Sequence, residues 1–334
     1  MKAVYLYVNS NTMNDQPSAS SSPNRLHFSG QGLDLFVILL VNGFLNLITL
    51  SLYYPWARVK LIKFYWENTE LNDTTFVFHG TGAEVFKGYI KLMLLSLVFV
   101  GCYIYATVTG QHAMSVMLIA VFYLVLLLLV PVAVHGGFKY RLSRTSWRNV
   151  HFGYRGNRTQ LIIEFLLGYL FTVLTLGIYA SWFTHKIRAY VISNIRFGSL
   201  GFQYTGTGFD LFLIQLKGIF LTVLTLGIYY AWYRKEWINY LIEHTYIEQN
   251  NERYRMHSSI SGGSLFGISL LNLVLVIITF GLAFPWAVTR TLEYVIAHIE
   301  LPDAINFDTI QQTENEYKDA TGEYLMDALD LGII

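Results

Sequence analysis

The chain has 334 residues, of which 54% are hydrophobic and only 13% are charged, and its formal net charge is +1. Soluble domains carry about 25% charged residues, so this composition excludes an ordinary soluble protein and favours a membrane protein. The small net charge gives no basic field for nucleic acid. The single cysteine, Cys102, excludes an internal disulfide framework.

Residues 1–27 are polar and rich in serine, and no apolar segment precedes Leu33. A cleaved signal peptide requires such a segment near the N-terminus. We therefore expect residues 1–27 to form a disordered polar tail. The first apolar segment is expected to stay in the mature protein.

Uncharged apolar stretches recur from residue 33 onward. The longest, 92–138, has 47 residues without Lys, Arg, Asp or Glu. Because one spanning helix needs about 20 apolar residues, this stretch predicts two helices with a turn near Gly110. Four shorter stretches predict one span each, at 33–54, 161–181, 211–231 and 265–286. The sequence therefore predicts an all-α membrane protein with about six transmembrane helices.

The apolar stretches belong to five copies of one sequence unit, predicted at 28–77, 78–153, 154–203, 204–259 and 260–300. Four units pair a turn glycine with a Trp at the far end of the apolar stretch. The pairs are Gly30–Trp56, Gly156–Trp182, Gly206–Trp232 and Gly262–Trp286, spaced by 26, 26, 26 and 24 residues. In the second unit Gly80 and Val132 are 52 residues apart, twice 26, which predicts one inserted helix.

Two further elements of the unit carry predictions. Pro55 and Pro285 directly precede a Trp and are expected to stop or kink a helix at the membrane interface. The basic, aromatic segments after the Trp, such as 57–66, are too charged to span. They predict short amphipathic helices that lie among the headgroups and bind anionic lipid. Glycine-containing turns or short strands are expected between the units.

Residues 301–334 form an acidic tail, because Glu300–Ile334 holds nine acidic residues and one Lys. We expect this tail to be mostly disordered, with a short helix near Tyr324–Leu331.

No residue set predicts catalysis, a cofactor or a metal. The G-x-G pairs lack the third glycine of a dinucleotide site, and the nine histidines form no H-E-x-x-H motif. Glu164 and Lys217 lie inside predicted spans, where charges are costly and suggest function, although either side chain could instead reach the interface. Antiparallel helices would separate them by roughly 15 Å along the membrane normal. Parallel units would let the two pair.

The repeated motifs resemble those of the bacterial YjgN family. The matching features are Phe-x-Gly-x-Gly, then Thr-Leu-Gly-Ile-Tyr-x-x-Trp or Tyr-Tyr-Pro-Trp-Ala-Arg, and Asn68-Thr69 before Phe76-x-Phe78. They cover roughly residues 26–300, and the second unit departs from them with Pro131-Val132 in place of Pro-Trp. This resemblance implies a multi-pass protein of the bacterial inner membrane. The family's biochemical function is not established, so the resemblance implies no catalytic residues.

The orientation follows from counting basic residues if six full crossings are assumed. The loops after the first, third and fifth spans carry 13 Lys and Arg, and the opposite side carries 7. The positive-inside rule then places both termini outside the cytoplasm. However, this topology puts the similar post-Trp segments on both faces, and re-entrant or shallow segments would reconcile the two.

Three classes of function are open. Internal repeats with Gly- or Pro-broken spans are typical of transporters and channels. Few buried charges and many interfacial aromatics favour a structural or accessory scaffold that interacts with lipid or with a partner protein. A lipid-modifying enzyme would need an acid, base or nucleophile near the interface, and no such set is visible. We therefore expect a membrane protein that is not an enzyme.

Overall fold

The computed structural model describes residues 24–313. Most of the predicted N-terminal tail, residues 1–23, and the helix predicted near Tyr324–Leu331 lie outside this range.

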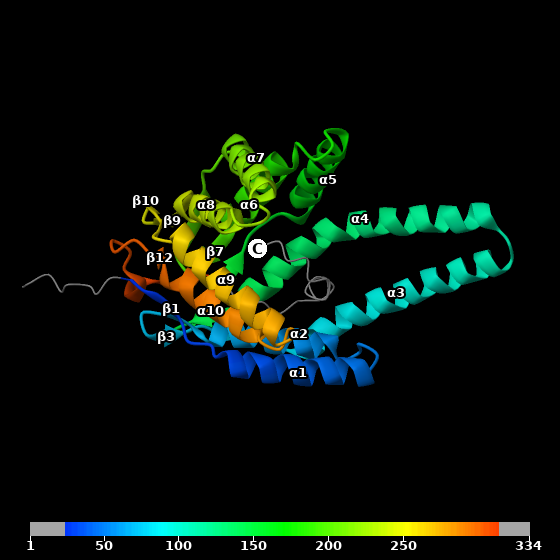
Figure 1. The fold of residues 1–334 in the computed structure, drawn as a ribbon, viewed down its shortest axis with the longest axis horizontal. Helices are drawn as coiled ribbons and strands as arrows, with labels where there is room; N and C mark the ends of the chain where they lie inside the picture. Colours follow the sequence, from blue (N-terminus) through cyan, green and yellow to red (C-terminus); the bar gives the residue numbers. More distant parts are fainter. Residues whose placement is uncertain (1–23, 314–334) are drawn as a thin grey trace, which may run out of the picture.

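Ten helices form five hairpins (Figure 1). In four hairpins a 17-residue first helix is followed by a 14-residue second helix. These are α1 (Gly32–Ile48) with α2 (Tyr54–Glu67), α5 (Arg158–Leu174) with α6 (Ala180–Ser193), α7 (Gly208–Leu224) with α8 (Tyr230–Glu243), and α9 (Gly262–Ile278) with α10 (Phe284–Ala297). The remaining hairpin is much longer and joins α3 (Gly82–Val108, 27 residues) to α4 (His112–Ser143, 32 residues).

The short hairpins reverse at a five-residue turn that the sequence had suggested to be the end of a span. In the turn after α5, Leu176 and Gly177 both take positive φ values, 52° and 93°. The Thr175 hydroxyl donates to the Phe171 carbonyl at 2.7 Å and accepts from the Tyr179 N–H at 3.0 Å. Glycine tolerates the left-handed conformation that such a reversal needs. The Thr-Leu-Gly-Ile-Tyr motif is therefore a chain reversal.

Short strands connect the hairpins, as expected, but they pair into sheets, so the fold is mostly helical and not all-α. The strands are β1 (Leu26–Phe28), β2 (Thr69–Leu71), β3 (Thr74–Thr75), β4 (Val77–Phe78), β5 (Thr145–Trp147), β6 (Val150–Tyr154), β7 (Ile195–Phe197), β8 (Leu200–Tyr204), β9 (Thr245–Gln249), β10 (Glu252–Arg255), β11 (His257–Ser258) and β12 (Ile299–Glu300). They form three antiparallel sheets, of which the largest has the order β10-β9-β8-β7-β6-β5-β4. Two-residue turns such as Asn72-Asp73 have positive φ at both positions, which matches the twist of a tight β-hairpin.

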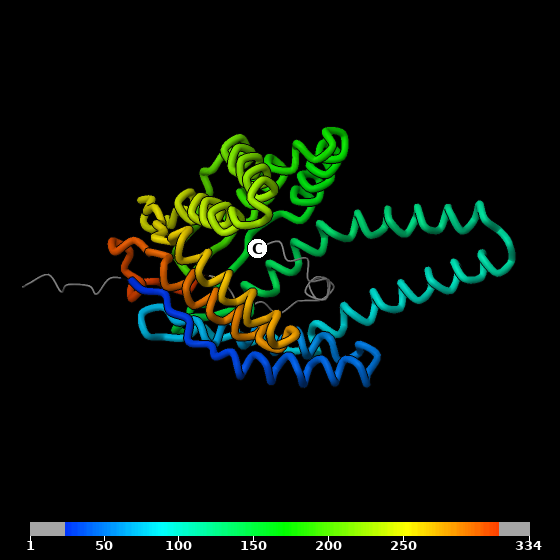
Figure 2. Tube along the Cα trace, in the orientation of Figure 1, coloured from blue at the N-terminus to red at the C-terminus, as the bar shows by residue number. Residues whose placement is uncertain are grey.

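The five hairpins close into a ring. Each second helix packs against the first helix of the next hairpin, and α10 packs against α1 to complete the circle (Figure 2). At the same seam Arg25 pairs with Glu300 as an isolated β-bridge. Because every hairpin begins and ends at a strand, all five hairpins extend from one layer of strands.

Four of the five junctions between hairpins share one contact. At the α2–α3 junction the Trp56 ring lies 5.1 Å from the Phe86 ring, and a Cβ built on Gly82 would come within 2.4 Å of Trp56 Cδ1. The equivalent sets are Trp182 with Gly208 and Phe212, Trp232 with Gly262 and Phe266, and Trp286 with Gly32 and Phe36. The α4–α5 junction has Val132 and Arg158 at these positions instead.

These contacts correct several predicted roles. The predicted repeat matched Gly262 with Gly30. The structure shows that Gly262 occupies the position of Gly32, and each lies 24 residues before the Trp of its own hairpin. Gly30, Gly80, Gly156 and Gly206 have no positive φ, and each packs directly against the aromatic residue two positions earlier. Pro55 and Pro285 lie in the first turn of α2 and α10, where proline is favoured, so they begin second helices.

The strand layer encloses its own apolar core. Trp147 is 1% exposed and packs with residues from several strands, including Leu71, Phe197 and Ile247. Ile305, Phe307 and Ile310 join this core from the segment after β12. The first part of the predicted acidic tail, residues 301–313, is therefore packed against the strands.

Candidate membrane-binding surface

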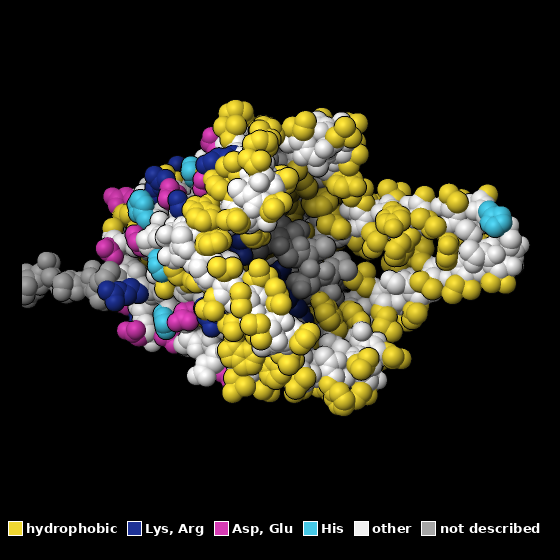
Figure 3. Space-filling view, in the orientation of Figure 1, with side chains coloured by type: hydrophobic (Ala, Val, Ile, Leu, Met, Phe, Trp, Pro, Cys, Tyr) yellow, Lys and Arg dark blue, Asp and Glu magenta, His cyan; other side chains and the backbone are white. Residues whose placement is uncertain are grey.

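Apolar and charged side chains separate to opposite ends of the molecule. Charged residues gather at the strand end, and hydrophobic side chains cover the helices (Figure 3). Large exposed apolar residues are frequent on the first helices, with seven on α1 alone, whereas α2 and α6 have none. The tips of the short hairpins carry some of the most exposed ones: Leu50 (84%), Leu176 (95%), Leu226 (95%) and Phe280 (97%). Such contiguous apolar surface is typical of contact with lipid or with another protein.

The number of uncharged residues around each tip limits how deep a hairpin can go. Crossing a bilayer twice takes about 40 apolar residues. The α3–α4 hairpin has 47 residues without Lys, Arg, Asp or Glu. The α1–α2, α5–α6, α7–α8 and α9–α10 hairpins have 23, 21, 16 and 34 around their tips. A 14-residue second helix is about 21 Å long, shorter than the roughly 30 Å hydrocarbon core.

Six spanning helices are therefore not confirmed. Within residues 24–313, two helices are long and apolar enough to cross a membrane, α3 and α4, and each buries only 11% of its most apolar window. Their tip is polar, with exposed Thr109, Gln111 and His112, unlike the apolar tips of the short hairpins. The long hairpin therefore differs from the four short ones both in length and in the polarity of its tip.

Glu164 and Lys217 do not pair with each other. The Lys217 ammonium donates to the Glu236 carboxylate of α8 at 2.7 Å, and Glu164 lies 3.9 Å from Lys186 of α6. Each of the two charges therefore pairs with an opposite charge on the second helix of its own hairpin. The Lys217 side chain is 53% exposed, so this ion pair is of the partly solvated kind that contributes little stability.

The second helices are markedly basic. Together they carry ten Lys and Arg but four Asp and Glu, whereas the first helices carry four of each. Arg188 of α6 lies over the Trp237 ring of α8, 4.5 Å from its centroid, so the second helices of these two hairpins touch. They form an inner wall behind the apolar first helices. The amphipathic segments predicted to lie flat among headgroups are these second helices, each folded back against its first helix.

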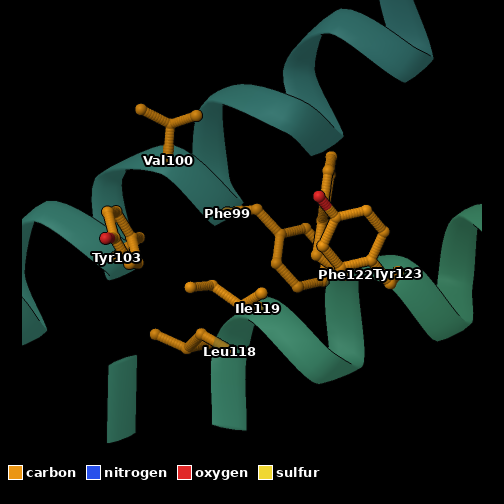
Figure 4. Close-up of a pocket in the computed structure, with 7 residues that line it drawn as sticks. All are labelled: Phe99, Val100, Tyr103, Leu118, Ile119, Phe122 and Tyr123. Atoms are coloured by element: carbon orange, nitrogen blue, oxygen red, sulfur yellow. The ribbon is translucent and has the colours of Figure 1, made fainter. Parts of the chain in front are cut away.

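An apolar pocket of about 230 Å³ lies between α3 and α4 (Figure 4). Phe99 and Phe122 pack against each other on one side of it, with ring centroids 5.3 Å apart. Val100, Leu118, Ile119 and two tyrosines complete the lining. This lining offers no carboxylate, imidazole or ammonium, so its chemistry suits a hydrocarbon chain.

Groups able to hold a metal or to act as catalysts are sparse. Among residues 24–313, no three His, Cys, Asp or Glu residues are grouped as metal ligands. His79 Nε2 lies 2.8 Å from the Ser146 hydroxyl, but Ser146 is only 4% exposed. This contact links the residue after β4 to β5. That the protein is not an enzyme and uses no cofactor stays a prediction.

A closed ring of helical hairpins with an apolar exterior and two membrane-length helices defines an integral membrane protein. The chain matches the model of the family described as "Bacterial protein of unknown function (DUF898)" over residues 23–203, 199–255 and 249–328. It therefore belongs to this family, as the sequence motifs predicted.

The relatives that the chain matches are named as inner-membrane proteins. The protein named Inner membrane protein YjgN of Salmonella typhimurium is 33% identical over 144 residues, which cover 43% of this chain and 34% of that protein. The protein of the same name from Escherichia coli O157:H7 is 32% identical over 127 residues, covering 38% of this chain and 30% of that protein. The matches thus span about a third of the relatives' length. No solved structure matches the chain.

Proposed function

We propose that this protein is a bacterial inner-membrane platform that enters the bilayer from one face and binds anionic lipid headgroups there. The observation that carries this proposal is that all five hairpins extend from one layer of strands and four of them have apolar tips. Inverted units, which would favour a transporter, are not seen among the described hairpins.

The strand layer is assigned to the cytoplasm by its charge. The five tips, residues 49–53, 109–111, 175–179, 225–229 and 279–283, contain no Lys or Arg. All basic residues of the described chain therefore lie on the strand side of the tips. The positive-inside rule places that side in the cytoplasm, and this replaces the count that assumed six crossings.

The basic second helices supply the lipid-binding chemistry. Lys and Arg near a membrane surface attract anionic lipid by about 1 kcal/mol each. Lys63 and Arg188 are half-buried on the inner wall formed by the second helices, where an anionic headgroup would be shielded from salt.

Binding of a short-chain lipid to the detergent-solubilised protein tests the proposal. Dioctanoyl phosphatidylglycerol should bind at least tenfold more tightly than dioctanoyl phosphatidylcholine. A Lys63→Gln/Arg188→Gln variant should lose most of this preference. An Arg148→Gln/Arg253→Gln variant in the strand layer removes the same charge and should keep the preference. Equal affinity of the intact protein for both lipids would contradict the proposal.

A further inference from the structure

The segment that follows the described chain is strongly acidic, and the inner wall is strongly basic. Residues 314–334 contain six Asp and Glu and one Lys. The second helices carry six more basic than acidic residues. The two charges are opposite in sign and similar in size, so the segment and the wall are electrostatically complementary.

The described chain ends at the strand layer, beside strands that lie close in sequence to α4 and α6. The Gln312 side chain accepts from the His151 N–H at 2.8 Å, and the Thr313 hydroxyl donates to the Gly198 carbonyl at 2.5 Å. These contacts fix the chain to β6 and to the turn between β7 and β8, and these strands follow α4 and α6 along the chain. Together α4 and α6 carry four Lys and Arg and no Asp or Glu.

The length of the segment is sufficient for docking. Residues 314–334 reach at most about 70 Å when extended, whereas a second helix is about 21 Å long. The segment also has apolar residues, Leu325 and Leu329 among them, between its carboxylates. It therefore matches a wall on which basic groups alternate with aromatic and aliphatic side chains.

We propose that the acidic segment 314–334 docks on the inner wall of the ring, against the basic residues of α4 and its neighbours. In that position it covers the same cations that bind anionic lipid under the proposed function. Segment and lipid then compete, and removal of the segment exposes the wall. The docking itself rests only on charge and chain path, while the competition also rests on the proposed lipid binding.

Photo-cross-linking in lipid-free detergent tests the docking. The full chain carries Tyr324→p-benzoylphenylalanine, and the cross-linked peptides are identified by mass spectrometry. We expect intramolecular cross-links to α2, α4 or α6, and at least a fivefold loss of yield in 0.5 M salt or after neutralising the six acidic residues. A Lys139→Gln/Arg141→Gln variant should show the same loss. Its elution volume and melting temperature establish that it is folded.

An unchanged yield in these variants, or cross-links confined to the strand turns or to other copies of the chain, would overturn the docking. Competition is measured separately. Truncation after Thr313 should raise the affinity for dioctanoyl phosphatidylglycerol at least fivefold. If neither chain binds this lipid, the proposed function fails while the docking result stands. If both bind equally and the cross-links are present, the segment docks without competing.

Discussion

Replacing Gly208 with alanine tests whether the Gly–Trp contacts hold the ring together. A Cβ at this position would lie 2.4 Å from Trp182 Cδ1 and 2.9 Å from Trp182 Cα. The second contact is with backbone, so a rotation of the Trp side chain cannot relieve it. The junction between α6 and α7 must therefore open slightly in Gly208→Ala.

The cost follows from overpacking. Forcing an extra methyl group into a packed contact costs about 1–3 kcal/mol, and the better helix propensity of alanine returns at most about 1 kcal/mol. We expect a net loss of about 1–2 kcal/mol. The melting temperature in detergent, followed by intrinsic fluorescence, should fall by a few degrees, since each kcal/mol moves it by about 2–4 °C in chains of 150–250 residues.

The matched control is Gly267→Ala in α9. A Cβ there would meet no atom within 4 Å, so the same substitution should leave stability unchanged or raise it slightly. The reasoning is refuted if Gly208→Ala melts like the unmodified protein, or if both variants are destabilised equally.

Three further predictions concern the tips, the ion pair and the strand layer. Leu226→Arg places a charge at an apolar tip, which costs about 2.5–3.5 kcal/mol if the tip lies deep in hydrocarbon. It should reduce the yield of folded protein extracted from membranes, whereas Asn251→Arg on a strand turn should not. Lys217→Met should lower the melting temperature by no more than about 4 °C, since partly exposed ion pairs contribute about 0–1 kcal/mol and each kcal/mol corresponds to about 2–4 °C; a larger fall would contradict this. The Tyr254 hydroxyl donates to the Glu252 carboxylate, which raises the pKa of Tyr254. Fluorotyrosine NMR at this position should show the pKa fall toward its ordinary value in Glu252→Gln, and no change would contradict the hydrogen bond.

The sequence predicted the apolar segments well because composition and charge spacing report directly on them. It located the long α3–α4 hairpin from 47 uncharged residues and placed a turn at Gly110, which has a positive φ. The recurrence of glycine and Trp also marked residues that meet at the junctions. The family followed from the same motifs.

The prediction of six spanning helices was not confirmed, because hydropathy does not determine which way the chain runs after an apolar stretch. Thr175, Leu176 and Gly177 end an apolar stretch, but whether the chain then leaves the membrane or reverses depends on backbone dihedrals that hydropathy does not encode. Two signals were available. The uncharged stretch around Gly227 is only 16 residues long, and a glycine-to-Trp spacing of 24 recurs in three hairpins once Gly32 and Gly208 are used in place of Gly30 and Gly206. The inner wall could not be foreseen, because it exists only when five hairpins close into a ring.

One topology map tests the central claim most directly. In a Cys102→Ser background, single cysteines are placed on the strand turns at Asp73, Asn149, Ser199 and Asn251, and at Gln111 on the tip of the α3–α4 hairpin; all five positions are exposed on the protein surface. A membrane-impermeant thiol reagent is applied to intact spheroplasts and to lysed cells. The account predicts that only Gln111→Cys is labelled in intact spheroplasts, while the four strand-turn positions react after lysis. Labelling of some strand-turn positions in intact spheroplasts, with others protected, would show that the hairpins cross the membrane and would contradict a platform inserted from one face.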